Sequence, residues 1–157
     1  MTDSNIQIVE YTPAYRDAFK DLNVQWISRY FKMEQADYNA LDDPEGYILS
    51  KGGHILMVLY NGEAVGTCAL IKMNDPKYDF ELAKMAVSPT VQGKGIGYLL
   101  GRAVIEKAKQ EGAKTLYLES NTILEPAINL YYKLGFIKVE GIESPYERCN
   151  IQMELDI

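Results

Sequence analysis

Three glycines alternate along one short stretch, Gln92-Gly93-Lys94-Gly95-Ile96-Gly97, between an apolar run and an amphipathic helical pattern. A helix N-terminus presents unpaired backbone N–H groups and the positive end of the helix dipole. Glycines at such a junction let a ligand approach these amides closely, so the stretch is typical of a phosphate-binding loop. The backbone would then supply the positive potential that a chain with a net charge of −6 lacks.

Two common phosphate-binding loops match this stretch poorly. A Walker loop needs Ser or Thr after Gly-Lys, and Gly95 follows Lys94 here, which excludes it. A dinucleotide fingerprint has its first glycine at the strand end and its third glycine three residues after the second; here residues 88–91 intervene and Tyr98 stands in the third place. From the loop alone, a glycine-rich turn without a ligand also remains open.

Hydrophobic periodicity predicts the elements that position this loop. Helices are predicted at 13–30, with Thr12 and Pro13 as N-cap and first position, and at 44–50, 96–111 and 126–134. Strands are predicted at 6–11, 54–60, 63–71, 78–87, 114–120, 136–141 and 148–155. Gly112 and Gly135 fit the position that follows a helix C-terminus.

The order of these elements predicts an α/β fold in a single domain, residues 1–157. Asn61-Gly62 is a strong hairpin signal, and short connections make the early strands antiparallel. The two strands that flank the helix at 96–111 need a crossover and should be parallel. The result is a mixed, mostly antiparallel sheet of six to seven strands with helices on both faces.

The composition excludes several classes of protein. The chain has 157 residues, 47% hydrophobic and 24% charged, and its N-terminus and apolar runs predict neither secretion nor a membrane span. Its acidity argues against general nucleic-acid binding. Cys68 and Cys149 lie in apolar, strand-like runs without metal-ligand spacing, which predicts buried reduced thiols, a cytoplasmic protein and no metal.

Two motifs together resemble the GNAT family of acyl-CoA N-acyltransferases. The glycine stretch matches Gln/Arg-x-x-Gly-x-Gly/Ala, and Ala127–Phe136 matches the late-helix pattern A-x-x-L-Y-x-x-x-G-F. The preceding LAKMAVSP resembles the family's fourth strand and loop, so the resemblance covers about residues 60–139. Gln92 replaces a frequent arginine and removes one charge from the pyrophosphate site, for which Lys94 and Arg102 would compensate.

The resemblance implies a fold in which the fourth and fifth strands, a parallel pair, splay apart at a cofactor cleft. It implies acetyl-CoA as cosubstrate, with pantetheine along the backbone of Met85, Ala86 and Val87. The backbone amides of residues 92–97 would hold the pyrophosphate, and Asn129 would contact the cofactor or remain exposed.

The resemblance also implies catalytic roles. A backbone N–H near Val87 would stabilise the oxyanion, and Tyr131 occupies the general-acid position, although helical periodicity alone favours a core tyrosine. Glu81, eleven residues before Gln92, stands where some members carry a glutamate base; otherwise it is a solvated strand charge. His54 is a weaker candidate, because a structural histidine at a strand start is commoner.

The predicted function is transfer of an acetyl group to a primary amine by direct attack in a ternary complex. Five aromatic side chains of the first half would wall the acceptor pocket: Trp26, Tyr30, Phe31, Tyr38 and Tyr47. Net acidity favours a cationic amine of either a small molecule or a protein. A non-catalytic acyl-CoA-binding module and a nicotinamide-dependent enzyme are the alternatives, and the sequence leaves open whether the protein is a homodimer.

Overall fold

A computed structural model describes residues 5–140 and 143–157 of the chain. Its centre is a seven-stranded sheet in the order β1-β2-β3-β4-β5-β7-β6. The strands are β1 (Ile6–Glu10), β2 (His54–Tyr60), β3 (Glu63–Lys72), β4 (Phe80–Val87), β5 (Thr115–Ser120), β6 (Ile137–Val139) and β7 (Ile151–Asp156). The mixed sheet predicted from the sequence is therefore confirmed.

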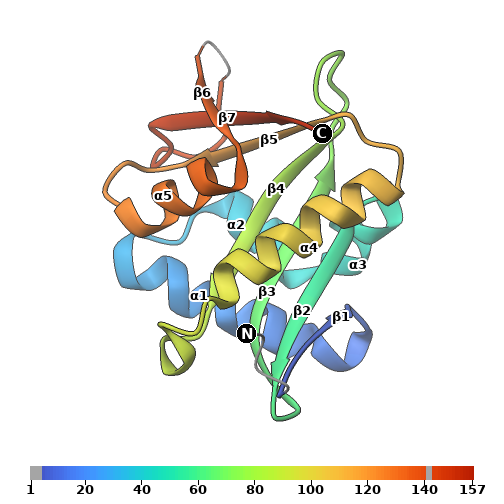
Figure 1. The fold of residues 1–157 in the computed structure, drawn as a ribbon, viewed down its shortest axis with the longest axis vertical. Helices are drawn as coiled ribbons and strands as arrows, with labels where there is room; N and C mark the ends of the chain where they lie inside the picture. Colours follow the sequence, from blue (N-terminus) through green and yellow to red (C-terminus); the bar gives the residue numbers. More distant parts are fainter. Residues whose placement is uncertain (1–4, 141–142) are drawn as a thin grey trace.

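All neighbouring strands are antiparallel except β4 and β5. This parallel pair is short, because only Phe80↔Leu116 and Glu81↔Tyr117 are in register. Beyond Glu81 the two strands diverge (Figure 1). The splayed parallel pair implied by the family resemblance is thus present, and it leaves one edge of β4 without a strand partner.

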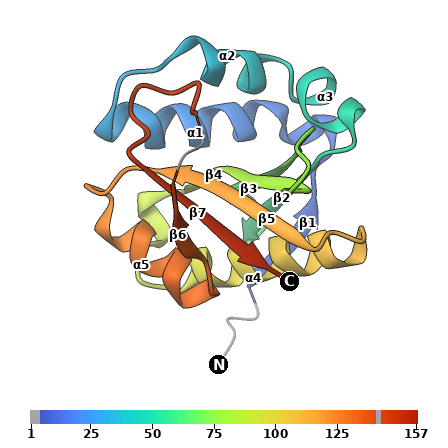
Figure 2. The ribbon, with the colours of Figure 1, turned by 90° about the horizontal axis from the view of Figure 1, so that it is seen from above.

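Helices cover both faces of the sheet, as predicted (Figure 2). One layer holds α1 (Arg16–Tyr30), α2 (Gln35–Asp42) and α3 (Pro44–Tyr47); the other holds α4 (Ile96–Gln110) and α5 (Glu125–Leu134). Each layer has its own apolar core. Leu82 of β4 belongs to the core beneath α4, and Ala86 of the same strand belongs to the core beneath α1.

Several predicted boundaries were wrong. A 3-10 turn at Pro13–Tyr15 precedes α1, and Thr12 makes no side-chain cap. No helix was predicted at α2, whose capping box is formed by two acidic residues, Glu34 and Asp37. The strand predicted at 148–155 begins only at Ile151, and the predicted strand 136–141 ends partly outside the described residues.

Glycines set the ends of α4 and its contact with α5. Gly95 is the N-cap residue of α4 with a φ of 71°, and Gly112 follows its C-terminus with a φ of 82°. Along the helix, a Cβ at Gly97 or Gly101 would lie 3.3 Å from Leu130 or 2.5 Å from Leu134 of α5. Small residues on α4 therefore let α5 pack close to the loop at residues 92–97.

Candidate active site

The part of β4 that β5 leaves unpaired, after Glu81, contains a β-bulge in its pairing with β3. Thr67 of β3 faces Ala86 and Ala69 faces Ala83, so two residues of β4, Lys84 and Met85, stand opposite one residue of β3. Lys84 has a φ of 54°, a left-handed conformation that side chains other than glycine rarely adopt. Of residues 85–87, predicted to line the cofactor cleft, Met85 belongs to this bulge and Ala86 and Val87 follow it, where β5 is no longer paired with β4.

The glycine loop is built to receive an anion through its backbone. Gly93 and Gly95 have φ values of 84° and 71°, and apart from their chain neighbours no residue has an atom within 4 Å of where their Cβ atoms would be. Within the described chain, the N–H groups of residues 93–98 donate no hydrogen bond. These free amides, at the positive end of a 15-residue helix, fit a pyrophosphate.

The structure refines the explanation of the three glycines. Gly93 and Gly95 are required by their backbone conformation and leave open space above the loop, whereas Gly97 accommodates Leu130 of α5. Lys94 is exposed beside this space, with its Nζ 5.1 Å from the centre of the Tyr60 ring. Asn129 is exposed on α5, one of the two outcomes that the sequence allowed.

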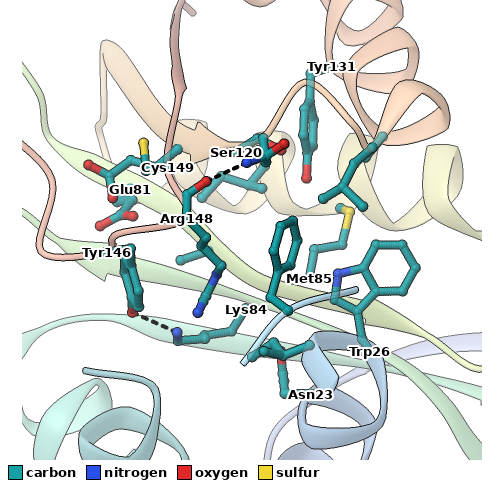
Figure 3. A pocket seen from close by; sticks show the side chains of 18 residues that line it. Asn23, Trp26, Glu81, Lys84, Met85, Ser120, Tyr131, Tyr146, Arg148 and Cys149 are labelled. Atoms are coloured by element: carbon teal, nitrogen blue, oxygen red, sulfur yellow. Dashed lines mark hydrogen bonds between the residues drawn. The ribbon is translucent and has the colours of Figure 1, made fainter. Parts of the chain in front are cut away.

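A cavity of about 110 Å³ opens between α1, β4, β5 and α5 (Figure 3). Its apolar part includes Trp26, Phe31 and Met85, and its polar part includes Glu81 and Glu119. Of the five aromatic residues predicted to wall the acceptor pocket, Trp26 and Phe31 line this cavity. Tyr30 and Tyr38 are 41% and 40% exposed, and Tyr47 packs on the core beneath α1.

Glu81 lies in the wall of this cavity, where its environment favours the neutral acid. Burial raises the pKa of its carboxyl to about 7, and the negative charge of Glu119 adds to the rise while Lys84 opposes it. Glu119 is held in place by hydrogen bonds from the Tyr117 and Ser144 hydroxyls, each 2.7 Å long. A carboxyl with a pKa near neutrality exchanges a proton readily at physiological pH.

Tyr131 reaches the same cavity from α5 (Figure 3). Its ring is 9% exposed and packs edge-on against Phe136, while its hydroxyl points into the cavity. Burial raises the pKa of this hydroxyl, so it stays protonated. Tyr131 is therefore both a core residue and a cavity residue, and the two readings of the sequence do not exclude each other.

An ionic cluster borders the cavity through Lys84, Tyr146 and Arg148, and the sequence reading missed it. We call it the Asp37 cluster: Glu34, Asp37, Lys84, Tyr146 and Arg148. Asp37 is fully buried and accepts hydrogen bonds from the Lys84 Nζ at 2.8 Å and from both Arg148 terminal nitrogens at 2.8 and 2.6 Å. Although burial alone would raise it, these partners lower the pKa of Asp37 to about 2.

Two further candidates take other places. His54 lies at the start of β2, where its Nε2 is 3.2 Å from Glu111 beyond the C-terminus of α4, and it does not line the cavity. Cys68 is buried, as predicted, but Cys149 is only half-buried and lines the cavity. The prediction for Cys149 was wrong because β7 begins three residues later than the apolar pattern indicated, so Cys149 precedes the strand.

Comparison with known proteins decides the family. The acetyltransferase (GNAT) family profile matches residues 13–136. The chain belongs to the GNAT acetyltransferase family. The match extends into the first half of the chain, where the sequence reading found no motif of the family. The activity is that of an N-acetyltransferase.

Relatives and structural neighbours agree with this family. The chain is 32% identical over 128 residues to the uncharacterized N-acetyltransferase YjgM of Escherichia coli K12, covering 73% of this chain and 76% of the relative. It is 26% identical over 116 residues to N-acetyltransferase 8 of Rattus norvegicus, covering 72% of this chain but only half of that relative.

Solved structures share the fold. A GNAT acetyltransferase from Staphylococcus aureus Mu50 superimposes with a TM-score of 0.86 at 22% identity, covering 96% of this chain and 98% of that one. A putative acetyltransferase from Salmonella typhimurium, solved with acetyl-CoA, has a TM-score of 0.78 at 19% identity, covering 98% and 94%. In the part of the chain that is described here, no helix is long and apolar enough to cross a membrane.

Proposed function

We propose that this N-acetyltransferase acetylates a primary amine that enters the cavity beside Trp26 and Glu81. The observation that carries this proposal is the convergence of three features on one cavity. The open edge of β4 and the Glu81 carboxyl of the same strand border it from one side, and the Tyr131 hydroxyl borders it from α5. An acyl transfer needs an acyl donor held in place, a base for the amine and an acid for the leaving thiolate.

The donor would lie along β4 with its pyrophosphate at the loop. Met85, Ala86 and Val87 would bind the pantetheine through backbone groups that β5 leaves unpaired. The amides of residues 93–97 would bind the pyrophosphate, whereas the N–H of Gln92, which the sequence placed in the same loop, donates to the Pro89 carbonyl at 3.4 Å. Lys94 would add positive charge in place of the arginine that Gln92 replaces. A backbone N–H near Val87 would donate to the thioester oxygen as negative charge develops there.

Glu81 would remove the proton from the amine and Tyr131 would protonate the departing sulfur. An alkylammonium has a pKa of about 10, so it must lose a proton before it attacks. A carboxyl with a pKa of about 7 accepts that proton, through water where direct contact is absent. The neutral amine would then attack the thioester directly in a ternary complex. Tyr131, which lines the cavity from α5, would donate its hydroxyl proton to the leaving sulfur.

The charges of the cavity favour a cationic amine. The two cations and two carboxylates of the Asp37 cluster compensate one another, which leaves Glu81 and Glu119 as the carboxylates that face the cavity. An ammonium group attracted to them would reach the base first. The family match leaves the non-catalytic and nicotinamide-dependent alternatives without support. A single domain over residues 1–157, a cytoplasmic location, a metal-free reaction and a homodimer stay predictions.

The test is release of CoA thiol from acetyl-CoA over a panel of alkylamines, polyamines, amino acids and peptide N-termini. We expect turnover with an amine that carries no carboxylate near the nitrogen. The Glu81→Gln variant should lose most activity near pH 6.5 and recover as the pH rises, because the free amine then becomes abundant. A pH profile that the substitution leaves unchanged would remove Glu81 from the mechanism.

A further inference from the structure

The bulge in β4 changes which face of the sheet each residue of the strand contacts. Before the bulge, Phe80 and Leu82 pack into the core beneath α4. After it, Ala86 packs into the core beneath α1. An uninterrupted strand would keep these three even-numbered residues on one face, so one extra residue has been inserted between Leu82 and Ala86.

Lys84 is the even-numbered residue at which the change occurs. In a regular strand its side chain would share the face of Phe80 and Leu82 and would carry an ammonium into an apolar core. The bulge instead directs it to the opposite face, where its side chain is 5% exposed. There its Nζ donates to Asp37 of α2 at 2.8 Å. It also donates to the Tyr146 hydroxyl at 2.7 Å (Figure 3).

The conformation of Lys84 carries a steric penalty that needs a compensating interaction. Within the described residues, the other non-glycine residue with a positive φ is Asn61, in the hairpin turn, where asparagine is favoured. A lysine in a strand has no such preference. Residues in sparsely populated conformations persist where their surroundings determine them, and here the surroundings are a fully buried carboxylate.

We propose that the Lys84–Asp37 ion pair fixes the position of the bulge in β4, which makes both side chains positioning residues for the acetyl-CoA cleft. The direction of backbone N–H groups alternates along a strand, so the bulge decides which amides of residues 85–87 face the cleft. Asp37 is itself held by Arg148 and by the Glu34 N–H at 2.9 Å, which anchors the pair to α2. The role of the cleft rests on the proposed function.

The test compares two substitutions that remove the same charge, Lys84→Gly and Lys84→Met. Glycine adopts a positive φ without a steric penalty. For other residues this penalty lowers the equilibrium constant for the left-handed conformation about tenfold. We expect the glycine variant to bind acetyl-CoA within about threefold of the wild type and the methionine variant about tenfold more weakly or worse. The values of kcat should follow the same order, whereas both variants should melt below the wild type because both lose the ion pair.

If Lys84 has only a structural role, the methionine variant should perform better than the glycine variant. Methionine packs better than glycine, and its backbone loses less conformational entropy on folding. Methionine binding acetyl-CoA as well as glycine, or better, would overturn the proposal. Backbone nuclear Overhauser contacts between β3 and β4 in the three unliganded proteins report the bulge directly. They separate a failure of this inference from a failure of the proposed function, since they need neither acetyl-CoA nor an acceptor.

A second pair of variants covers the case in which Lys84→Met does not fold. When Lys84 is replaced in an Asp37→Asn background, no unpaired charge of the Lys84–Asp37 ion pair remains. Arg148 keeps its ion pair with Glu34. The Asp37→Asn/Lys84→Gly protein should bind acetyl-CoA about tenfold more tightly than Asp37→Asn/Lys84→Met. Equal affinities in this pair would also overturn the proposal.

Discussion

Replacing Glu81 with glutamine should stabilise the protein at alkaline pH and leave it unchanged at acid pH. Burial, with the negative charge of Glu119, raises the pKa of Glu81 from 4.5 to about 7 in the folded state. The folded protein therefore holds a proton that the unfolded chain releases, and the free energy of unfolding falls as the pH rises through this interval. A rise from 4.5 to about 7 corresponds to about 3 kcal/mol.

The cost of ionising Glu81 is nearly absent at pH 4.5 and complete above pH 8. Glu81→Gln removes it, so the free energy of unfolding from urea titrations should exceed that of the wild type by about 3 kcal/mol at pH 8 and by less than about 0.5 kcal/mol at pH 4.5. Glu63→Gln, at the exposed hairpin, is the control and should change little at either pH. Equal stability of Glu81→Gln and wild type at pH 8 would refute the argument that burial holds this carboxyl neutral.

Two further predictions concern the cofactor and the acid. Tyr131→Phe keeps the ring that packs on Phe136, so we expect kcat to fall about 100-fold while the Kd for acetyl-CoA is unchanged; a lower Tm with unaltered kcat would make Tyr131 a core residue only. Acetyl-CoA at about 100 times its Kd should stabilise the folded wild type by about 2.7 kcal/mol and raise its Tm. Gly95→Glu places a carboxylate at the loop and should abolish this thermal shift. Gly112→Glu, with a similar φ and equally open surroundings at the other end of α4, is its matched control and should keep the shift; a shift that survives in Gly95→Glu would place the cofactor elsewhere.

The features that the sequence predicted correctly are encoded by neighbouring residues. Asn61-Gly62 forms a hairpin, and Gly112 and Gly135 end their helices, because a positive φ at these points is a local requirement. The parallel order of β4 and β5 follows from the helix between them, which forces a crossover. The glycine loop at residues 92–97 was found in the same way, since its spacing and the helix behind it are local.

Burial decided what local pattern left open. Periodicity made Tyr131 a core residue and the family motif placed it in the site; the structure shows one side chain at the boundary of both. The strand position of Glu81 was visible in the sequence, but its raised pKa depends first on burial and then on the charge of Glu119, which lies on a strand that pairs with β4 for only two residues.

The Asp37 cluster was beyond the reach of sequence reasoning, since Asp37 and Arg148 are 111 residues apart and α2 itself was missed. A lysine inside an apolar strand was the one local signal, and it does not reveal where its counter-charge lies. The chain sequence thus determined the order of the elements and the loop for the cofactor, because turns, caps and glycine conformations act between neighbours. Only the tertiary structure determined the bulge at Lys84 and the polar wall of the cavity, because a buried charge is stable only where the fold supplies its partner.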